Sequence, residues 1–249
     1  MTTALDLLFV ILIAVVWPLF DYLVLWPAFL RRVQTGPARA RKWIWAVTIA
    51  EQWALVAAGI ALWWSNERDW ASLGLLLPEG WRLWGSVGLV LLLAAFQART
   101  ASRVARSPRA QASVRKQLGT LAALLPHARA ELGWFVALSL TAGFCEEFLF
   151  RGYFIWAFEA WLGWWGAAAL SALFFAILHA YQGLNGVIRS GIIGVLLTLA
   201  VAVFRSLLPA IELHAVVDIG SGTIVWLAVR GESVDGNVSE AGVSQSGCL

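Results

Sequence analysis

The chain has 249 residues, of which 60% are hydrophobic and only 13% are charged. Soluble domains are nearer half apolar and a quarter charged, so this composition excludes a soluble fold and requires apolar surface to face lipid. The net charge is only +3, and the basic residues are concentrated in short segments between apolar stretches. Such segments indicate membrane topology, and we expect a lipid bilayer and no nucleic acid as partner.

Apolar stretches recur along the whole chain. A hydrocarbon core of about 30 Å requires about 20 helical residues. The sequence therefore predicts an all-α, polytopic membrane protein with about seven transmembrane helices. The predicted spans are residues 5–30, 43–64, 83–98, 132–157, 161–182, 187–206 and 208–229.

The linkers between the spans predict the topology. Segments 31–42 and 99–116 together hold eleven Lys and Arg residues, which favours the cytoplasmic face for both. The N-terminus then lies outside and the C-terminus inside. Residues 231–249 are rich in Gly and Ser and lack apolar periodicity, which predicts a disordered tail.

Several predicted spans contain ionisable residues. Such groups are costly at membrane depth and are functional candidates by default. They are Asp21, Glu51, Glu146, Glu147, Arg151, His179, Glu212, His214 and Asp218.

The fourth predicted span carries three of these residues. Glu147 and Arg151 are four residues apart and share one helix face, so they could form a buried ion pair. Glu146 points about 100° away and has no local cation. An unpaired carboxylate at this depth could serve as a general base. The alternative is a structural charge cluster that holds helices together.

Histidines mark the fifth and seventh spans. His179 alone is more often a structural group than a catalytic one. His214 and Asp218 lie four residues apart, so the carboxylate could orient the imidazole or both could hold a metal. Glu146 and His214 are both predicted in the outer half of the bilayer. His179 reaches that depth only if its span begins late, near residue 167.

Three short motifs follow in order: Glu-Glu-x-x-x-Arg at 146–151, Phe-x-x-x-His at 175–179 and His-x-x-x-Asp at 214–218. Together they resemble the CPBP family of intramembrane proteases, the CAAX-protease and bacteriocin-processing (Abi) family. The resemblance covers about residues 120–230, whereas residues 1–110 match only in being hydrophobic. It therefore implies N-terminal membrane spans over 1–118, a catalytic core over 119–230 and a tail over 231–249.

The resemblance also implies a mechanism within an intramembrane polar cavity. Glu146 would activate the attacking water, helped by His179, and Glu147 and Arg151 would hold the site in shape. His214 and residue 218 would stabilise the oxyanion. Members of the family often have Asn at the position of Asp218. Ionised Asp only accepts hydrogen bonds, so Asp218 orients His214, holds a proton or binds a metal.

Cofactor use has two alternatives. Zinc would be held by His179, His214 and one carboxylate, either Glu146 or Asp218. Because each helix supplies only one His, the sequence favours glutamate chemistry that requires no cofactor. The expected function is an intramembrane endopeptidase that acts on a membrane-associated protein or peptide, with a bacterial inner membrane as the expected location. The alternatives are a catalytically idle scaffold or bacteriocin-immunity protein, and a proton-linked transporter.

Overall fold

The computed structural model describes residues 2–230, and all regular elements among these residues are helical. Six helical stretches are long and apolar enough to cross a membrane. They are Ala4–Thr35, Pro37–Ser65, Trp81–Arg106, Arg129–Leu178, Ala180–Phe204 and Leu208–Val229. The prediction of an all-α, multi-pass membrane protein is confirmed. The predicted disordered tail, 231–249, lies outside the described residues.

The fourth stretch replaces two of the predicted spans. It consists of α7 (Arg129–Glu146), the π-helix η5 (Glu147–Phe154) and α8 (Ile155–Leu178). The helix breaks at Gly163, where φ is +65° and ψ is 164°. Glycine adopts this conformation without a steric penalty, whereas other residues do not.

Side-chain contacts show that the chain reverses at Gly163. The ring of Phe150 packs edge-on against Phe175, at 5.6 Å between centroids, and Phe154 packs against Phe174 at 5.8 Å. The hydroxyl of Ser171 donates to the carbonyl of Phe150 at 2.7 Å. The two arms therefore form an antiparallel hairpin, which supplies two of the seven predicted crossings.

The first span is interrupted by two π-helical segments. It consists of α1 (Ala4–Ile11), η1 (Leu12–Val16), α2 (Trp17–Phe20), η2 (Asp21–Leu25) and α3 (Trp26–Thr35). Pro18 and Pro27 each follow one of the π-helical segments. A proline lacks a backbone N–H, and its ring clashes with the carbonyl four residues earlier, so a widened turn accommodates it.

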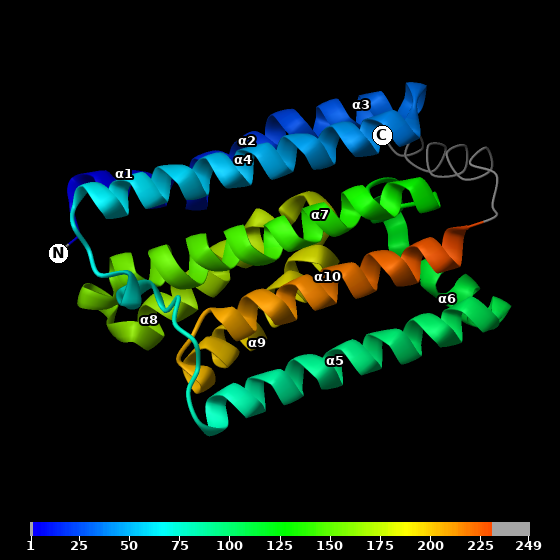
Figure 1. The fold of residues 1–249 in the computed structure, drawn as a ribbon. Coiled ribbons are helices and arrows are strands. Elements are labelled where there is room, and N and C mark those ends of the chain that lie inside the picture. The colour runs from blue at the N-terminus through cyan, green and yellow to red at the C-terminus, as the bar shows by residue number, and fades with distance from the viewer. Residues whose placement is uncertain (1, 231–249) are drawn as a thin grey trace.

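The remaining helices surround the hairpin (Figure 1). The first span and α4 (Pro37–Ser65) form one layer, and α4 packs against α7. On the other side of α7, α10 (Leu208–Val229) lies between α7 and α5 (Trp81–Arg106). The helix α9 (Gly183–Phe204) packs against α8. The short elements are η3 (Trp70–Leu73), α6 (Pro108–Leu118), η4 (Gly119–Ala123) and η6 (Ala180–Gln182).

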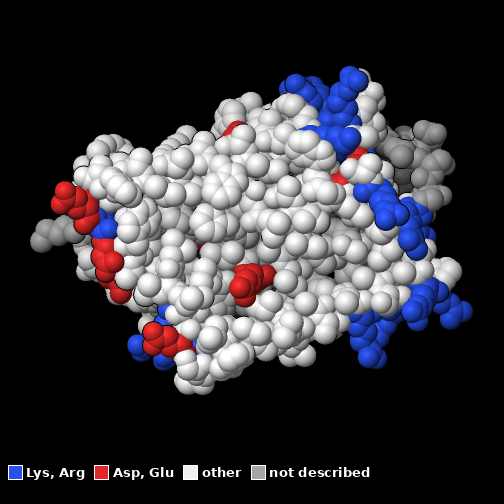
Figure 2. Space-filling view, viewed as in Figure 1, with Lys and Arg blue, Asp and Glu red and all other residues white. Residues whose placement is uncertain are grey.

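Charged side chains lie mainly at the two ends of the bundle. Figure 2 shows Lys and Arg gathered at the end where α3 meets α4 and where α5 meets α6. Both predicted basic segments therefore share one end, as two cytoplasmic segments must. The acidic side chains visible in this view lie mostly toward the opposite end.

One buried ion pair near each end fixes the N-terminal spans against the hairpin. At the acidic end, Arg68 donates to both carboxylate oxygens of Asp6, at 2.8 and 2.6 Å, and the Tyr153 hydroxyl also donates to Asp6. At the basic end, Arg41 donates to Glu131 at 2.8 Å. These contacts hold the first span and α4 against α7 and η5, and so define the walls of the cavity described below.

Candidate active site

Glu147 is the centre of the polar cluster. Its side chain is fully buried, and one oxygen, Oε1, accepts hydrogen bonds from two neighbours. Arg151 Nη1 lies 3.0 Å away on the same helix, and His214 Nδ1 lies 2.9 Å away on α10. The predicted ion pair between Glu147 and Arg151 is therefore present and buried. The same carboxylate also orients the imidazole of His214.

Arg151 is anchored on three further groups. Its Nη2 donates to the carbonyl of Gly194 at 3.0 Å, and its Nε donates to the Thr198 hydroxyl at 3.4 Å. Its guanidinium lies 4.1 Å from the ring centroid of Phe175. A Cβ added to Gly194 would lie only 3.0 Å from the same Nη2, so glycine leaves the room that the guanidinium occupies. Arg151 is thus satisfied by structural contacts.

A close helix contact brings Glu147 to His214. Gly143 lies one turn before Glu147, and a Cβ there would meet the carbonyl oxygen of Ile211 at 3.0 Å and the backbone of Ala215 at 3.1 Å. Only a residue without a side chain lets α7 and α10 approach this closely.

Glu146 faces a different direction, as the sequence predicts. Its Oε1 accepts a hydrogen bond from Gln52 Nε2, on α4, at 2.8 Å. Its Oε2 is buried and has no hydrogen-bond partner among the described residues. The nearest ionisable nitrogen to that oxygen is His214 Nε2, at 3.9 Å. Glu146 thus has one oxygen held in place and one oxygen free.

His179 reaches the same depth as Glu146 through the hairpin. Glu146 lies 17 residues before Gly163, and His179 lies 16 residues after it. Two antiparallel arms of nearly equal length bring the two side chains level. The first arm runs from Arg129 to Gly163, about 50 Å at about 1.5 Å per residue, and so extends beyond the hydrocarbon core. Because the hairpin turns beyond the hydrocarbon core, the second arm enters the core some residues after Gly163. This is the late start of the fifth span that His179 needs in order to reach the depth of Glu146.

The end of α8 fixes the tautomer of His179. The His179 N–H bonds to the carbonyl of Ala176 in a tightened last turn, which frees the carbonyl of Phe175. His179 Nδ1 lies 2.9 Å from that carbonyl oxygen, so Nδ1 donates and Nε2 is left as an acceptor. A helix end offers such carbonyls, because the last turn leaves them without an intrahelical partner.

Asp218 lies beside His214 but does not hold its Nδ1. Its Oδ2 is 3.7 Å from His214 Nε2, and 37% of its side chain is exposed. Because Glu147 already accepts from Nδ1, the orienting role that the sequence allowed for Asp218 belongs to Glu147.

A cavity of about 100 Å³ opens in front of Glu146. It lies between the first span, α4, α7 and the end of α8, and Glu146, His179 and Gln52 all line it. This volume is large enough to admit several water molecules. The polar cavity that the family resemblance implies is therefore present within the bundle.

The proposed zinc ligands do not converge. Among residues 2–230, no three His, Cys, Asp or Glu side chains are grouped closely enough to hold a metal ion. His214 Nδ1 is occupied by Glu147, and only its Nε2 faces Glu146. A zinc site requires three protein ligands about 2.0–2.2 Å from the ion. The set His179, His214 and Glu146 does not meet this condition in the arrangement described.

Residues 128–220 match the family model described as type II CAAX prenyl endopeptidase, Rce1-like. This segment is similar to members of the Rce1-like family. All six predicted site residues lie within the Rce1-like segment: Glu146, Glu147, Arg151, His179, His214 and Asp218. No curated protein and no solved structure matches the chain. The Rce1-like match, with six apolar helices, supports a CAAX-protease-like endopeptidase in the membrane.

Gln52 lies outside the Rce1-like segment, and the sequence did not predict its role. A neutral amide in a membrane span is less conspicuous than a charge. Two signals were available in the sequence. Gln52 follows the ionisable Glu51, and it lies seven residues after Trp45 and four after Thr48, a spacing that places all three on one helix face, which lines the cavity.

Proposed function

We propose that the chain is an intramembrane endopeptidase that hydrolyses a membrane-associated protein or peptide with water activated by Glu146 and His179. The observation that carries the proposal is the buried, unpartnered Oε2 of Glu146 at the wall of a cavity that His179 also lines. A buried acceptor without a partner is costly unless it serves a ligand. A water molecule in this cavity would supply the missing donor.

The chemical step begins with that water. Glu146 removes one proton as the water oxygen attacks the carbonyl carbon of the scissile bond. A tetrahedral intermediate forms, with negative charge on the former carbonyl oxygen. The C–N bond then breaks as the proton held by Glu146 passes to the leaving nitrogen, which regenerates the carboxylate. His179 Nε2, an acceptor in the tautomer fixed by Phe175, orients the attacking water.

The oxyanion requires a donor on the opposite side of the scissile carbon. We assign this role to His214. The assignment is supported by the contact of its Nδ1 with Glu147, which leaves Nε2 between Glu146 and Asp218. In its protonated form, His214 donates from Nε2 to the oxyanion. Glu147 and Arg151 act through His214 and are positioning residues.

No cofactor enters this mechanism. The ligands available for zinc are not grouped, and each step is carried by a side chain with a defined neighbour. The bacterial inner membrane expected from the sequence remains the proposed location.

The decisive experiment compares the membrane proteomes of cells that produce the wild-type chain and Glu146→Gln. Glutamine keeps the hydrogen bond from Gln52 in reach but cannot take a proton from water. We expect new protein termini with the wild type that disappear with Glu146→Gln. Glu212→Gln is the matched control, because Glu212 is an exposed carboxylate of α10 that does not line the cavity. Identical termini from the wild type and Glu146→Gln would overturn the assignment and favour an idle scaffold.

A further inference from the structure

The wall of the cavity opposite the hairpin is rich in free hydrogen-bond acceptors. Asp21 Oδ1 and Gln52 Oε1 are buried atoms that lack a partner among the described residues, as is Oε2 of Glu146. All three residues line the same cavity. Gln52 is only 2% exposed, and its Nε2 is already used by Glu146, so only its carbonyl oxygen is free. The same lining has one buried donor without a partner among the described residues, Trp17 Nε1, so a ligand that fills this space must bring mainly donors.

The same wall carries carboxyl groups without a cation among the described residues. No Lys or Arg among the described residues lines the cavity. The buried arginines near it are paired elsewhere: Arg41 with Glu131, Arg68 with Asp6 and Arg151 with Glu147. Asp21, by contrast, lies near two further carboxyl groups, those of Glu51 and Glu146. Carboxylates away from water are retained at a cost unless a positive charge joins them.

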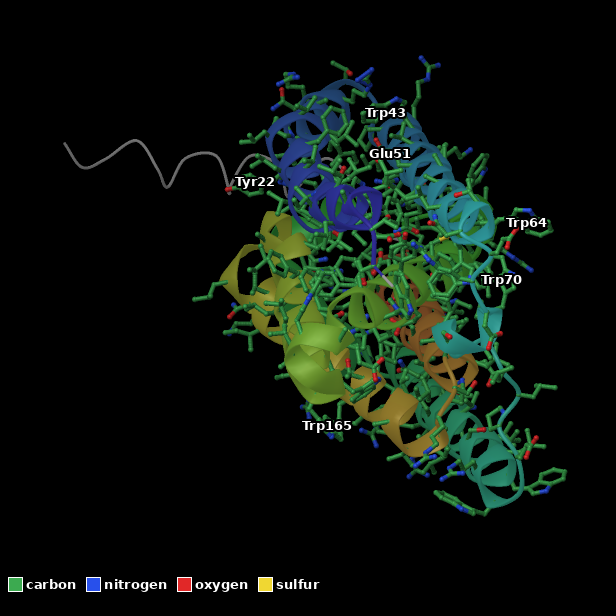
Figure 3. All side chains as sticks on the ribbon, turned by 90° about the vertical axis from the view of Figure 1, so that its left-hand side faces the viewer. Tyr22, Trp43, Glu51, Trp64, Trp70 and Trp165 are labelled. Carbon is green, nitrogen blue, oxygen red and sulfur yellow. The ribbon has the colours of Figure 1, made fainter. Side chains whose placement is uncertain are left out.

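The second carboxylate, Glu51, lies at the same interface. In the end-on view of Figure 3, Glu51 lies between the first span and α4, whereas Tyr22 lies on the outer side of the first span. The Oε2 atom of Glu51 is also buried and without a hydrogen-bond partner among residues 2–230. Asp21, on the first span, and Glu51, on α4, are near one another, and only Asp21 is among the residues that line the cavity.

Aromatic rings complete this wall. Trp17, Trp26, Trp45 and Tyr181 line the cavity. The rings of Trp26 and Tyr181 lie 5.1 Å apart between centroids, and Trp45 is fully buried with its N–H bound to the carbonyl of Leu124. Aromatic faces attract cations, most strongly when water is excluded. Carboxylates, a free amide oxygen and aromatic rings together suit an ammonium or guanidinium group.

We infer that Asp21, with Glu51 behind it, forms a specificity subsite that binds a Lys or Arg side chain of the substrate. The inference rests on the proposed function, because Asp21 and the catalytic Glu146 line one cavity and the bound cation would lie beside the scissile bond. Asp21 begins the π-helical segment Asp21–Leu25, and π-helical turns frequently occur at functional sites.

The test uses peptide sublibraries of apolar residues in which one position is fixed as Lys, norleucine or Glu. Norleucine matches most of the length of Lys but has no charge. The full chain in detergent is compared with Asp21→Asn, Asp21→Lys and Glu51→Gln, and with Glu212→Gln as the control. Cleavage is read by mass spectrometry. Binding is read separately, as peptide retained by immobilised Glu146→Gln.

We expect the wild type to cleave the Lys sublibrary about tenfold or more faster than the norleucine sublibrary, mainly through KM. Asp21→Asn should remove this preference, Glu51→Gln should reduce it, and Asp21→Lys should favour Glu instead. Glu212→Gln should keep it. Equal cleavage of Lys and norleucine by the wild type, or a preference unchanged in Asp21→Asn, would overturn the inference.

The binding arm separates this inference from the proposed function. If no sublibrary is cleaved, the protease proposal fails, but retention on Glu146→Gln still decides the subsite. Lys peptides should be enriched on Glu146→Gln, and this enrichment should disappear on the double variant that also carries Asp21→Asn. That result supports a cation site. Equal retention of Lys and norleucine peptides shows that no such site exists.

Discussion

His214 Nδ1 and Glu147 Oε1 lie 2.9 Å apart, although 67 residues separate them in the chain. The contact joins α10 to the π-helix that follows α7. Because the same oxygen accepts from Arg151, one carboxylate fixes both an imidazole and a guanidinium. The geometry of the candidate oxyanion donor therefore depends on a residue that does not face the cavity.

The first prediction concerns this shared carboxylate. Glu147→Ala and Arg151→Ala should each lower the free energy of unfolding by about 3–5 kcal/mol, because removal of one partner leaves a buried charge unpaired. Thermal unfolding in detergent measures the effect. Glu212→Ala, an exposed carboxylate of α10, is the control and should melt like the wild type. Wild-type melting of both site variants would contradict a buried pair.

The second prediction concerns Gln52. Gln52→Met keeps the volume of the side chain but removes the donor to Glu146 Oε1. Because the carboxylate is then held less firmly, cleavage should fall about tenfold, a barrier change of about 1.4 kcal/mol. Thr100→Val is the control, because this hydroxyl donates to the Phe96 carbonyl of its own helix and Thr100 does not line the cavity. Full activity of Gln52→Met would show that Glu146 needs no such support.

The third prediction addresses Asp218. Since Glu147 orients His214, an ionised carboxylate at 218 is not needed to hold the imidazole. Asp218→Asn should therefore retain activity within about threefold, which is less than 1 kcal/mol. Asp218→Leu, which removes all hydrogen bonding, should lose more. Initial rates of peptide cleavage measure both. A loss with Asn as large as with Leu would mean that the charge itself is required.

The fourth prediction concerns metal dependence. Because the candidate ligands are not grouped among the described residues, purified active protein should keep its activity in a strong chelator. Elemental analysis of the same sample should find zinc well below one equivalent. Stoichiometric zinc whose removal stops cleavage, and whose return restores it, would replace the metal-free mechanism.

The fifth prediction concerns orientation. Single cysteines are introduced at Arg39 and Arg109, in the basic segments, and at Glu79 at the opposite end, in a chain with Cys248→Ser. The remaining Cys145 is buried. A membrane-impermeant thiol reagent should label only Glu79→Cys in intact cells, since basic segments stay on the cytoplasmic side. Labelling of Arg39→Cys from outside would reverse the topology.

Local spacing was enough to predict part of the site. Glu147 and Arg151 pair as their separation of four residues indicates, and Glu146 points away from them as the helical rotation requires. These relationships depend on one helix alone. The Rce1-like match over 128–220 is likewise consistent with the motifs that the sequence presents.

Relationships between helices could not be predicted in the same way. The sequence predicts His179 inside a span of 161–182. In the structure, α8 ends at Leu178, and the two arms of the hairpin meet at Gly163. Only the glycine itself signalled the reversal. The partnership of Glu147 with His214 depends on the close approach at Gly143, and that of Glu146 with Gln52 on the packing of α4 against α7. No local pattern specifies either contact.

The end of the second arm of the hairpin bears on how water can reach the site. From Gly163 to His179 the arm spans about 24 Å, at about 1.5 Å per residue, so the chain leaves its α-helix at His179 while still level with Glu146. From His179 the α-helix is replaced by the 3-10 turn η6, before α9 begins at Gly183. Backbone of this kind is tolerated at membrane depth where it is buried in protein or lines a water-filled cavity, and His179 and Tyr181 line the cavity. The proposed hydrolysis consumes one water molecule in each turnover, and this turn is a part of the cavity wall whose backbone is compatible with water beside Glu146.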